Sequence, residues 1–168
     1  DRGDTLRARV MIVATGVEWR RLPVQGIERF IGHGVYYGAA RSDAALTQGV
    51  DVVIVGAGNS AGQAAIFFSR HARSVTMLVR GEGLEASMST YLITQIAAND
   101  GIHVEVRSEL VGLHGNDDLV GVDVLDKASG TVARHDAAVV FVMIGADAVT
   151  GWLPPSVARD GHILTPSE

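Results

Sequence analysis

The 168-residue sequence contains no cysteine, which excludes disulfides, thiolate metal sites and a redox dithiol within this chain. Aromatic residues make up only 5% of it, and no apolar run approaches the ~20 residues of a membrane-spanning helix. Positive charge is also scarce, because 14 Lys and Arg stand against 19 Asp and Glu and give a formal net charge of −5. We therefore expect no nucleic-acid partner, no membrane partner and a cytoplasmic location.

Apolar residues are plentiful at 47%, enough for the core of one domain or slightly more. The six histidines stand singly, without the spacing of metal ligands, so we expect no metal site. The sequence begins with Asp-Arg-Gly and shows neither an initial Met nor a signal-peptide pattern. We expect the chain to be a piece of a longer protein.

Apolar runs of strand length alternate with helical patterns through the middle of the chain. The runs are apolar on both faces, which is typical of central parallel strands. Segments 59–72 and 87–100 have helical spacing, and we expect Ser87 or Ser89 to cap the second helix and Gly101 to end it. Strand, helix and strand in this order predict βαβ crossovers. The predicted parallel strands are 51–56, 74–79, 102–106 and 138–143.

Other segments have different patterns of apolar and polar residues. Residues 109–135 alternate apolar and polar around two turn sequences, which predicts a three-stranded antiparallel meander. The β-branched run 7–16 predicts one more buried strand, and 17–34 has the composition of an ordered connector. The expected fold class is α/β, a Rossmann-like domain whose parallel sheet has helices on one face and the meander on the other.

A glycine turn follows the first of these strands. Gly56-Ala-Gly58-Asn59-Ser60-Ala61 fits the pattern G-x-G-x-x-A/G. Gly56 permits a tight turn, Gly58 lets backbone approach a pyrophosphate, and Ala61 lets the helix pack close to the sheet. Asn59 and Ser60 are placed to add donors at the helix N-terminus, where anions are favoured. The surrounding strands and helix favour a dinucleotide site over the alternative, a tight turn without a ligand.

The end of the second strand bears on which dinucleotide is bound. NAD-preferring sites usually place Asp or Glu there, to accept from the ribose hydroxyls. This strand ends at Val79 without an acid, and Arg80 follows directly. A guanidinium at this point suits a 2′-phosphate, so we predict NADPH rather than NADH. The alternative is a solvated arginine in a surface loop.

These features resemble the NADPH-binding part of the low-molecular-weight thioredoxin reductases and their cysteine-less relatives. The chain looks most similar to thioredoxin-reductase-like flavoproteins that are fused to cyclic-nucleotide-binding domains. The passages that carry the resemblance are VMIVATGVEWRRLPVQG (10–26), GVYYGAARSD (34–43), VGAGNSAGQAA (55–65), LVRGEGLEASMSTYL (78–92) and FVMIGADAVTGWLP (141–154).

The resemblance implies an FAD/NAD(P)-binding domain of a pyridine nucleotide-disulphide oxidoreductase. Residues 1–41 would be a connector from an FAD domain, 42–145 the NADPH-binding domain and 146–168 a return segment toward the FAD domain. NADPH would bind to this chain with its nicotinamide near Gln63, Ile144 and Gly145. FAD would bind to the parent protein, mostly through segments outside this chain. The chain alone would therefore be inactive.

The sequence also departs from the family pattern. The family's dithiol falls at Gly38 and Arg41, so these residues cannot relay electrons through sulfur. Gln63 stands where the family has an acid beside the nicotinamide, and it can still hydrogen-bond a carboxamide. Gly81 and Glu85 replace two cations of the 2′-phosphate site, which predicts a modest NADPH affinity.

The expected function is that of the NADPH-binding half of an FAD-dependent oxidoreductase of the thioredoxin reductase type. The nucleotide would present hydride to the flavin. Expected partners are NADPH, the FAD domain of the same parent chain and an unidentified electron acceptor, and the resemblance also allows a homodimer. The missing dithiol keeps one alternative open, a non-catalytic NADP(H)-sensing module. A dehydrogenase with its own catalytic Tyr is less favoured, because no Tyr-x-x-x-Lys pair occurs.

Overall fold

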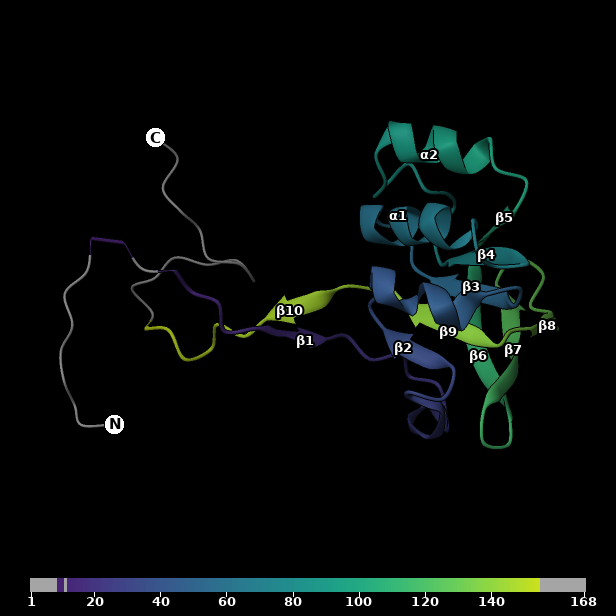
Figure 1. Cartoon of the computed structure of the whole chain (residues 1–168), viewed down its shortest axis with the longest axis horizontal. Helices are drawn as coiled ribbons and strands as arrows, with labels where there is room; N and C mark the ends of the chain where they lie inside the picture. Colours follow the sequence, from purple (N-terminus) through teal and green to yellow (C-terminus); the bar gives the residue numbers. More distant parts are fainter. Residues whose placement is uncertain (1–8, 11, 155–168) are drawn as a thin grey trace. The chain divides into compact units, whose positions relative to one another are not determined.

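The structure, a computed structural model, describes residues 9, 10 and 12–154, which divide into two compact units (Figure 1). Residues 21–144 form the larger one, called the α/β unit below. The described residues up to Arg20 and from Gly145 onward form the second, called the ribbon unit. The division predicted at residues 41 and 145 stays a prediction.

The ribbon unit is built on one antiparallel pair, β1 (Val17–Trp19) with β10 (Ala146–Ala148). Residues 155–168 of the predicted return segment lie outside the described residues, as do 1–8 and 11. The buried strand predicted at 7–16 is wrong for the residues of that run that the structure describes, because they form no strand. Val10 is 79% exposed and Ile12 is 88% exposed. A strand needs a hydrogen-bonding neighbour, and β10 pairs with the three residues that follow this run.

A five-stranded parallel sheet forms the centre of the α/β unit. Its strand order is β2-β9-β3-β4-β5. All four predicted parallel strands are present within a residue or two of their expected bounds. The strands are β2 (Val35–Tyr37), β3 (Asp51–Val55), β4 (Ser74–Val79), β5 (Ile102–Val106) and β9 (Val139–Val142).

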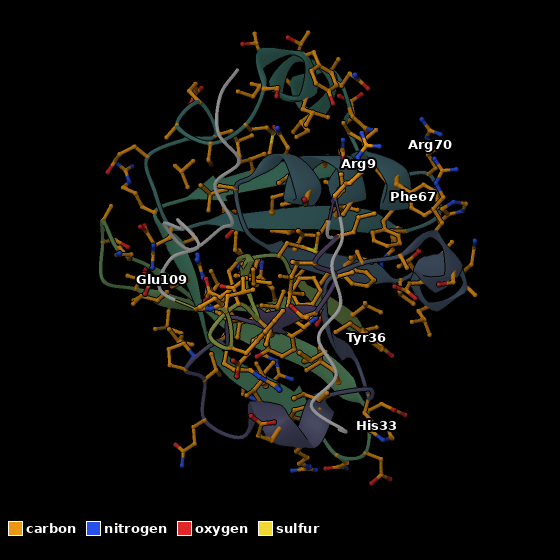
Figure 2. The ribbon with its side chains drawn as sticks, turned by 90° about the vertical axis from the view of Figure 1, so that its left-hand side faces the viewer. Arg9, His33, Tyr36, Phe67, Arg70 and Glu109 are labelled. Atoms are coloured by element: carbon orange, nitrogen blue, oxygen red, sulfur yellow. The ribbon has the colours of Figure 1, made fainter. Side chains whose placement is uncertain are left out.

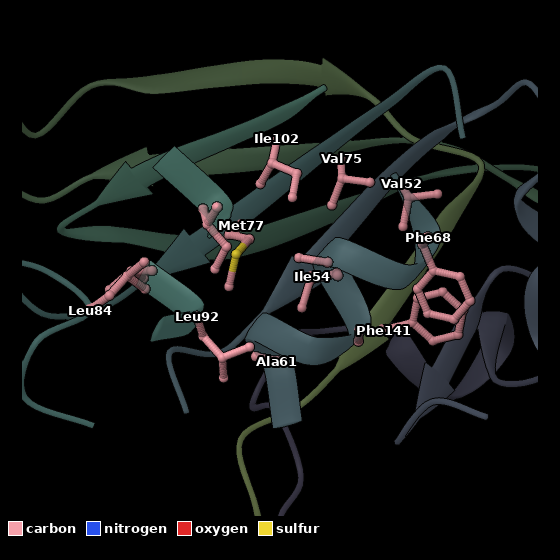
Figure 3. Close-up of a cluster of buried hydrophobic side chains, with 14 of the residues drawn as sticks. Val52, Ile54, Ala61, Phe68, Val75, Met77, Leu84, Leu92, Ile102 and Phe141 are labelled. Carbon is pink, nitrogen blue, oxygen red and sulfur yellow. The ribbon is translucent and has the colours of Figure 1, made fainter. Parts of the chain in front are cut away.

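Side chains of the central strands enter two different cores in alternation, as the two-residue period of a strand requires. Val52 and Ile54 face the helices, whereas Val53 and Val55 face the opposite layer. On the helix side, Phe68 and Phe141 stack with ring centroids 4.4 Å apart (Figure 3). Because both faces are covered, these strands read as continuous apolar runs in the sequence.

Two helices cover one face of the sheet (Figure 1). They are α1 (Asn59–Phe68) and α2 (Thr90–Ala97), both shorter than predicted. After α1 the chain passes Arg70, near Phe67 in Figure 2, and turns back toward β3, where the Gly49 amide donates to the His71 carbonyl. The predicted helix was too long because the helical spacing of apolar residues continues to residue 72, whereas this turn ends α1 at Phe68. No helix in the described part of the chain is long and apolar enough to cross a membrane.

The other face of the sheet is covered by the predicted antiparallel meander. It consists of β6 (Ser108–Gly115), β7 (Leu119–Asp126) and β8 (Val132–Asp136). Its inward side chains, such as Val122 and Val124, share a core with Val53 and Val140 of the parallel sheet. The predicted fold class, a Rossmann-like sheet with helices on one face and a meander on the other, is thereby confirmed.

Residues 21–47 contribute more to this unit than the sequence indicated. Val24, Ile27 and Phe30 are buried against the meander core, and Ile27–Phe30 forms the 3-10 helix η1. β2 pairs with β9 as an edge strand, and a second 3-10 helix, η2 (Arg41–Thr47), leads into β3.

Candidate functional site

The carboxyl ends of three neighbouring strands meet at one edge of the parallel sheet. Val55 pairs in register with Leu78, and Val79 with Val106. The residues that follow β3, β4 and β5 therefore lie along the same edge. In open α/β sheets, ligands bind at this edge.

Gly56 begins the turn after β3, and the protein itself requires a glycine there. Its φ of 149° is a conformation that other residues rarely adopt. A Cβ at this position would lie 2.4 Å from the carbonyl oxygen of Met143, which follows β9. The Gly56 amide donates to the Leu78 carbonyl at 3.1 Å, which connects the turn to β4.

Gly58, the N-cap residue of α1, lies in a different environment. Its φ is −84°, and a Cβ built on it would meet no other atom within 4 Å. Glycine is one of several residues favoured at an N-cap, but neither backbone conformation nor packing within the described protein requires a glycine here. No side chain caps the helix, so the first N–H groups of α1 have no side-chain acceptor.

The other residues of the turn differ in burial. Ala61 is fully buried in the core between α1 and the sheet. Asn59 and Ser60 are exposed on the first turn of the helix. Gln63 is also exposed, one turn further along α1.

Two serines that precede α2 fasten that segment to the glycine turn. Ser87 Oγ donates to the Ala57 carbonyl at 2.9 Å. The Ser89 amide and hydroxyl both donate to Asn59 Oδ1, at 2.8 and 3.0 Å. Of the two predicted caps, Ser89 occupies the N-cap position of α2, but its side chain makes no capping hydrogen bond to the helix. Because Oδ1 accepts both bonds, Asn59 Nδ2 remains a donor with no partner among the described residues.

Arg80 extends from the end of β4 into solvent, and no residue in the described ranges pairs with its guanidinium. The neighbouring acids are arranged differently from each other. Glu82 forms an ion pair with Arg107 at 3.1 Å, whereas the Glu85 carboxylate lies over Gly83. A cation free to bind an anion thus stands beside the glycine turn.

The two predicted residues near the end of β9 belong to different units. Ile144 is partly buried against the meander core of the α/β unit. Gly145 belongs to the ribbon unit, where its carbonyl accepts from the Arg20 amide at 3.2 Å. The structure thus brings Gly56, Gly58, Asn59, Ser60, Ala61 and Arg80 to one edge of the sheet. Roles for Gln63, Ile144 and Gly145 toward a nicotinamide stay predictions.

The two positions that the resemblance assigns to the family's dithiol carry no sulfur. Gly38 is buried, has a φ of 82° and donates to the Val142 carbonyl at 3.1 Å. Arg41 is exposed at the start of η2. A conformation with positive φ disfavours any side chain at position 38, cysteine included.

Sequence reasoning missed two contributors to this edge. The serine contacts with Asn59 and Ala57 span 30 residues and leave no local pattern. Arg107 had a usable signal, because it directly follows the predicted strand 102–106, and parallel strands end at a common edge.

Comparisons with known proteins agree with this architecture. The model of the family described as "Pyridine nucleotide-disulphide oxidoreductase" matches residues 1–165. A thioredoxin reductase from Mycolicibacterium smegmatis is 35% identical over 144 residues, which are 86% of this chain and 45% of that protein. An NADH dehydrogenase from Bacillus subtilis (strain 168) is 29% identical over 166 residues, 98% of this chain and 32% of that protein.

A solved structure of a thioredoxin reductase has a similar fold. The thioredoxin reductase from Streptococcus pyogenes MGAS5005 has a TM-score of 0.78 to this chain at 28% sequence identity. The match covers 90% of this chain and 49% of that one. The chain thus spans less than half the length of these relatives.

Proposed function

Because the chain belongs to the pyridine nucleotide-disulphide oxidoreductase family and is thioredoxin-reductase-like within it, we propose that it is the NADPH-binding half of an FAD-dependent oxidoreductase. The nucleotide would lie across the edge formed by the ends of β3 and β4. Its pyrophosphate would meet the glycine turn, and its 2′-phosphate would meet Arg80.

The observation that carries this proposal is the open space at Gly58. Gly56 is needed by the protein's own packing, whereas Gly58 adopts an ordinary φ with nothing near its missing side chain. A pyrophosphate approaching the backbone explains the glycine. The helix N-terminus and Asn59 Nδ2 supply donors to it, and positive charge at the end of the helix dipole favours the anion.

Arg80 supports NADPH over NADH. Its guanidinium is unpaired in the described protein and can form charge-assisted hydrogen bonds with a phosphate. Val79, which precedes it, is buried and offers no acceptor for free ribose hydroxyls. Hydrogen bonds to charged groups contribute about 1.5–3 kcal/mol, which corresponds to a preference of roughly ten- to hundred-fold.

Bound NADPH supplies a hydride from its nicotinamide, and FAD is the proposed acceptor in the parent protein. The residues of this chain would hold the nucleotide and orient it. With no cysteine in the sequence, the electrons cannot pass from flavin to a dithiol at positions 38 and 41. The acceptor beyond the flavin would have to be supplied by another segment or another molecule.

Calorimetric titration of the chain with NADPH and with NADH tests the proposal. We expect tighter binding of NADPH, and Arg80→Ala should weaken NADPH while leaving NADH nearly unchanged. Added salt should reduce the preference, because the contact is exposed. Equal affinities for the two nucleotides in the unaltered chain would contradict the cofactor assignment, and no binding of either would contradict the whole proposal.

The missing dithiol favours one second candidate, an NADP(H)-sensing module without turnover. The two functions differ in what happens to a flavin. Anaerobic titration of the full-length parent with NADPH should bleach the visible flavin absorption if the protein is an oxidoreductase. A full-length parent that binds NADPH and shows no flavin absorption would favour the sensing module.

A further inference from the structure

Arg107, which links β5 to β6, has an unusual backbone conformation. Its φ of 52° makes it the one non-glycine residue with positive φ among those that the structure describes. Backbone in this region is sparsely populated, and such residues concentrate at functional sites. Two hydrogen bonds hold it there, from the Arg107 amide to the Gly81 carbonyl and from the Lys127 amide to the Arg107 carbonyl, at 2.8 and 2.9 Å.

These bonds place Arg107 beside the loop that begins with Arg80. β4 and β5 are paired so that Val79 lies opposite Val106, and each arginine directly follows the last residue of its strand. The Arg107 side chain is about half exposed, and its guanidinium reaches Glu82 of the loop that begins with Arg80, with Nη1 3.1 Å from Oε2. Glu82 is 82% exposed, so it is free to move aside.

Without Arg107, this edge of the sheet has too little positive charge to bind a phosphate well. The loop itself carries one cation, Arg80, and two acids, Glu82 and Glu85, so its own net charge is negative. A nucleotide 2′-phosphate carries about −1.5 to −2 at neutral pH, if it titrates as other phosphate monoesters do. One arginine next to two carboxylates is a poor site for such a group, whereas two arginines on adjacent strand ends can hold it from both sides.

We propose that Arg107 is a second cation for the 2′-phosphate of NADPH, and that Glu82 occupies its guanidinium in the free protein. The phosphate replaces Glu82 as the partner of Arg107 when the nucleotide binds. The backbone bonds at Gly81 and Lys127 fix the position from which the side chain reaches the site. Arg107 thus compensates for the cations that Gly81 and Glu85 do not provide. This inference rests on the proposed NADPH site.

The test uses Arg107→Gly, because glycine tolerates the positive φ and the variant removes the guanidinium without adding backbone strain. NADPH and NADH are titrated by calorimetry at fixed ionic strength. We expect NADPH to bind roughly ten-fold more weakly and NADH to change less than two-fold. Arg70→Ala is the matched control, since Arg70 is an exposed arginine beyond the opposite end of α1 and should alter neither affinity (Figure 2).

Glu82→Gln separates a direct role from mere neutralisation of Glu82. Freeing Arg107 should tighten NADPH several-fold and leave NADH unchanged. In the Glu82→Gln background, Arg107→Gly should still weaken NADPH at least three-fold. If Arg107→Gly has no effect there, the arginine only masks Glu82 and the inference is overturned.

The outcome also distinguishes this inference from the proposed function beneath it. If Arg80→Ala weakens NADPH and Arg107→Gly does not, only the role of Arg107 fails. If the unaltered chain binds no NADPH, the proposed site fails and the inference with it. Thermal unfolding of each variant, expected within a few degrees of the parent, verifies that a lost affinity reflects the site.

Discussion

Arg73 donates hydrogen bonds from Nε and Nη2 to the two carboxylate oxygens of Asp51, and so joins the residue before β4 to the first residue of β3. Ser74 Oγ adds a third bond to the same carboxylate at 2.8 Å. The side chain of Asp51 is only 17% exposed. This arrangement lies at the opposite edge of the sheet from the glycine turn and holds the two strands in register.

These contacts make stability depend on pH in a definite direction. The Arg73 hydrogen bond holds the pKa of Asp51 below its ordinary value, opposed by partial desolvation. A depressed folded-state pKa gives stability that is present above about pH 4 and is lost as the pH falls through the lowered value. Asp51→Asn should therefore cost about 1 kcal/mol at pH 7, and the cost should vanish in strong acid.

Urea unfolding at a series of pH values measures this difference. Asp117→Asn serves as the control, because Asp117 is exposed in the β6–β7 turn and has no hydrogen bond or ion pair within the described ranges. A destabilisation by Asp51→Asn that stays constant down to strong acid would show that the charge of Asp51 is not its cause.

The two glycines of the turn should respond differently to alanine. Gly56→Ala forces a Cβ against the Met143 carbonyl and should cost about 1–3 kcal/mol of unfolding free energy. Gly58→Ala meets no atom and should cost about 1 kcal/mol at most, from the poorer N-cap. Nevertheless Gly58→Ala should weaken NADPH at least ten-fold. Chemical denaturation combined with calorimetry separates the two effects; full NADPH affinity in Gly58→Ala would argue against a phosphate close to that backbone.

Of the two positions that the resemblance assigns to the family's dithiol, Gly38 should matter for stability, and neither should matter for redox chemistry. Gly38→Ala places a side chain at a φ of 82° and should lower the unfolding free energy by roughly 1 kcal/mol. Arg41→Ala, at an exposed site, should change it by less than about 0.5 kcal/mol. In the full-length parent, stopped-flow measurement should find the NADPH-to-flavin step within several-fold of normal in both variants. A thousand-fold loss would assign chemistry to these positions.

The stacked rings of Phe68 in α1 and Phe141 in β9 should contribute more to the free energy of unfolding than the other aromatic side chains of the helix-side core. Phe68 and Phe141 are almost completely buried and lie parallel. Phe141→Ala should cost about 3–5 kcal/mol, because the cavity lies between a helix and a central strand and cannot close. Phe67→Ala, at a partly exposed ring, should cost clearly less in the same urea titration. Equal costs would mean that the core relaxes around the missing ring.

Much of this fold was predictable because the central strands are buried on both faces. β3 and β9 are continuous apolar runs for that reason, and their bounds were predicted within a residue or two. β2 escaped prediction, because three residues between glycine-rich turns carry too little pattern. The described residues of the run at 7–16 have the composition of a strand but form none, since a strand needs a hydrogen-bonding neighbour that composition does not reveal.

The residues of the candidate site likewise include some that the sequence predicts and some that it does not. Gly56, Gly58 and Ala61 were predictable because their spacing along one turn is local. The orientation of Asn59 depends on Ser89, which is distant in sequence, and folding alone brings the two together. Arg107 lies between these cases, since its strand was predicted and its pairing with Glu82 was not.

The place of β9 in the sheet has a consequence for biosynthesis. β9 is the last strand of the sheet to leave the ribosome, yet it lies between β2 and β3 and pairs with both. Until Val139–Val142 emerges, β2 has no partner in the sheet and β3 presents one bare edge. Exposed strand edges invite pairing with other chains. From the emergence of β3 until that of β9, a nascent chain of this protein therefore carries its sheet open between β2 and β3, and the insertion of β9 closes it.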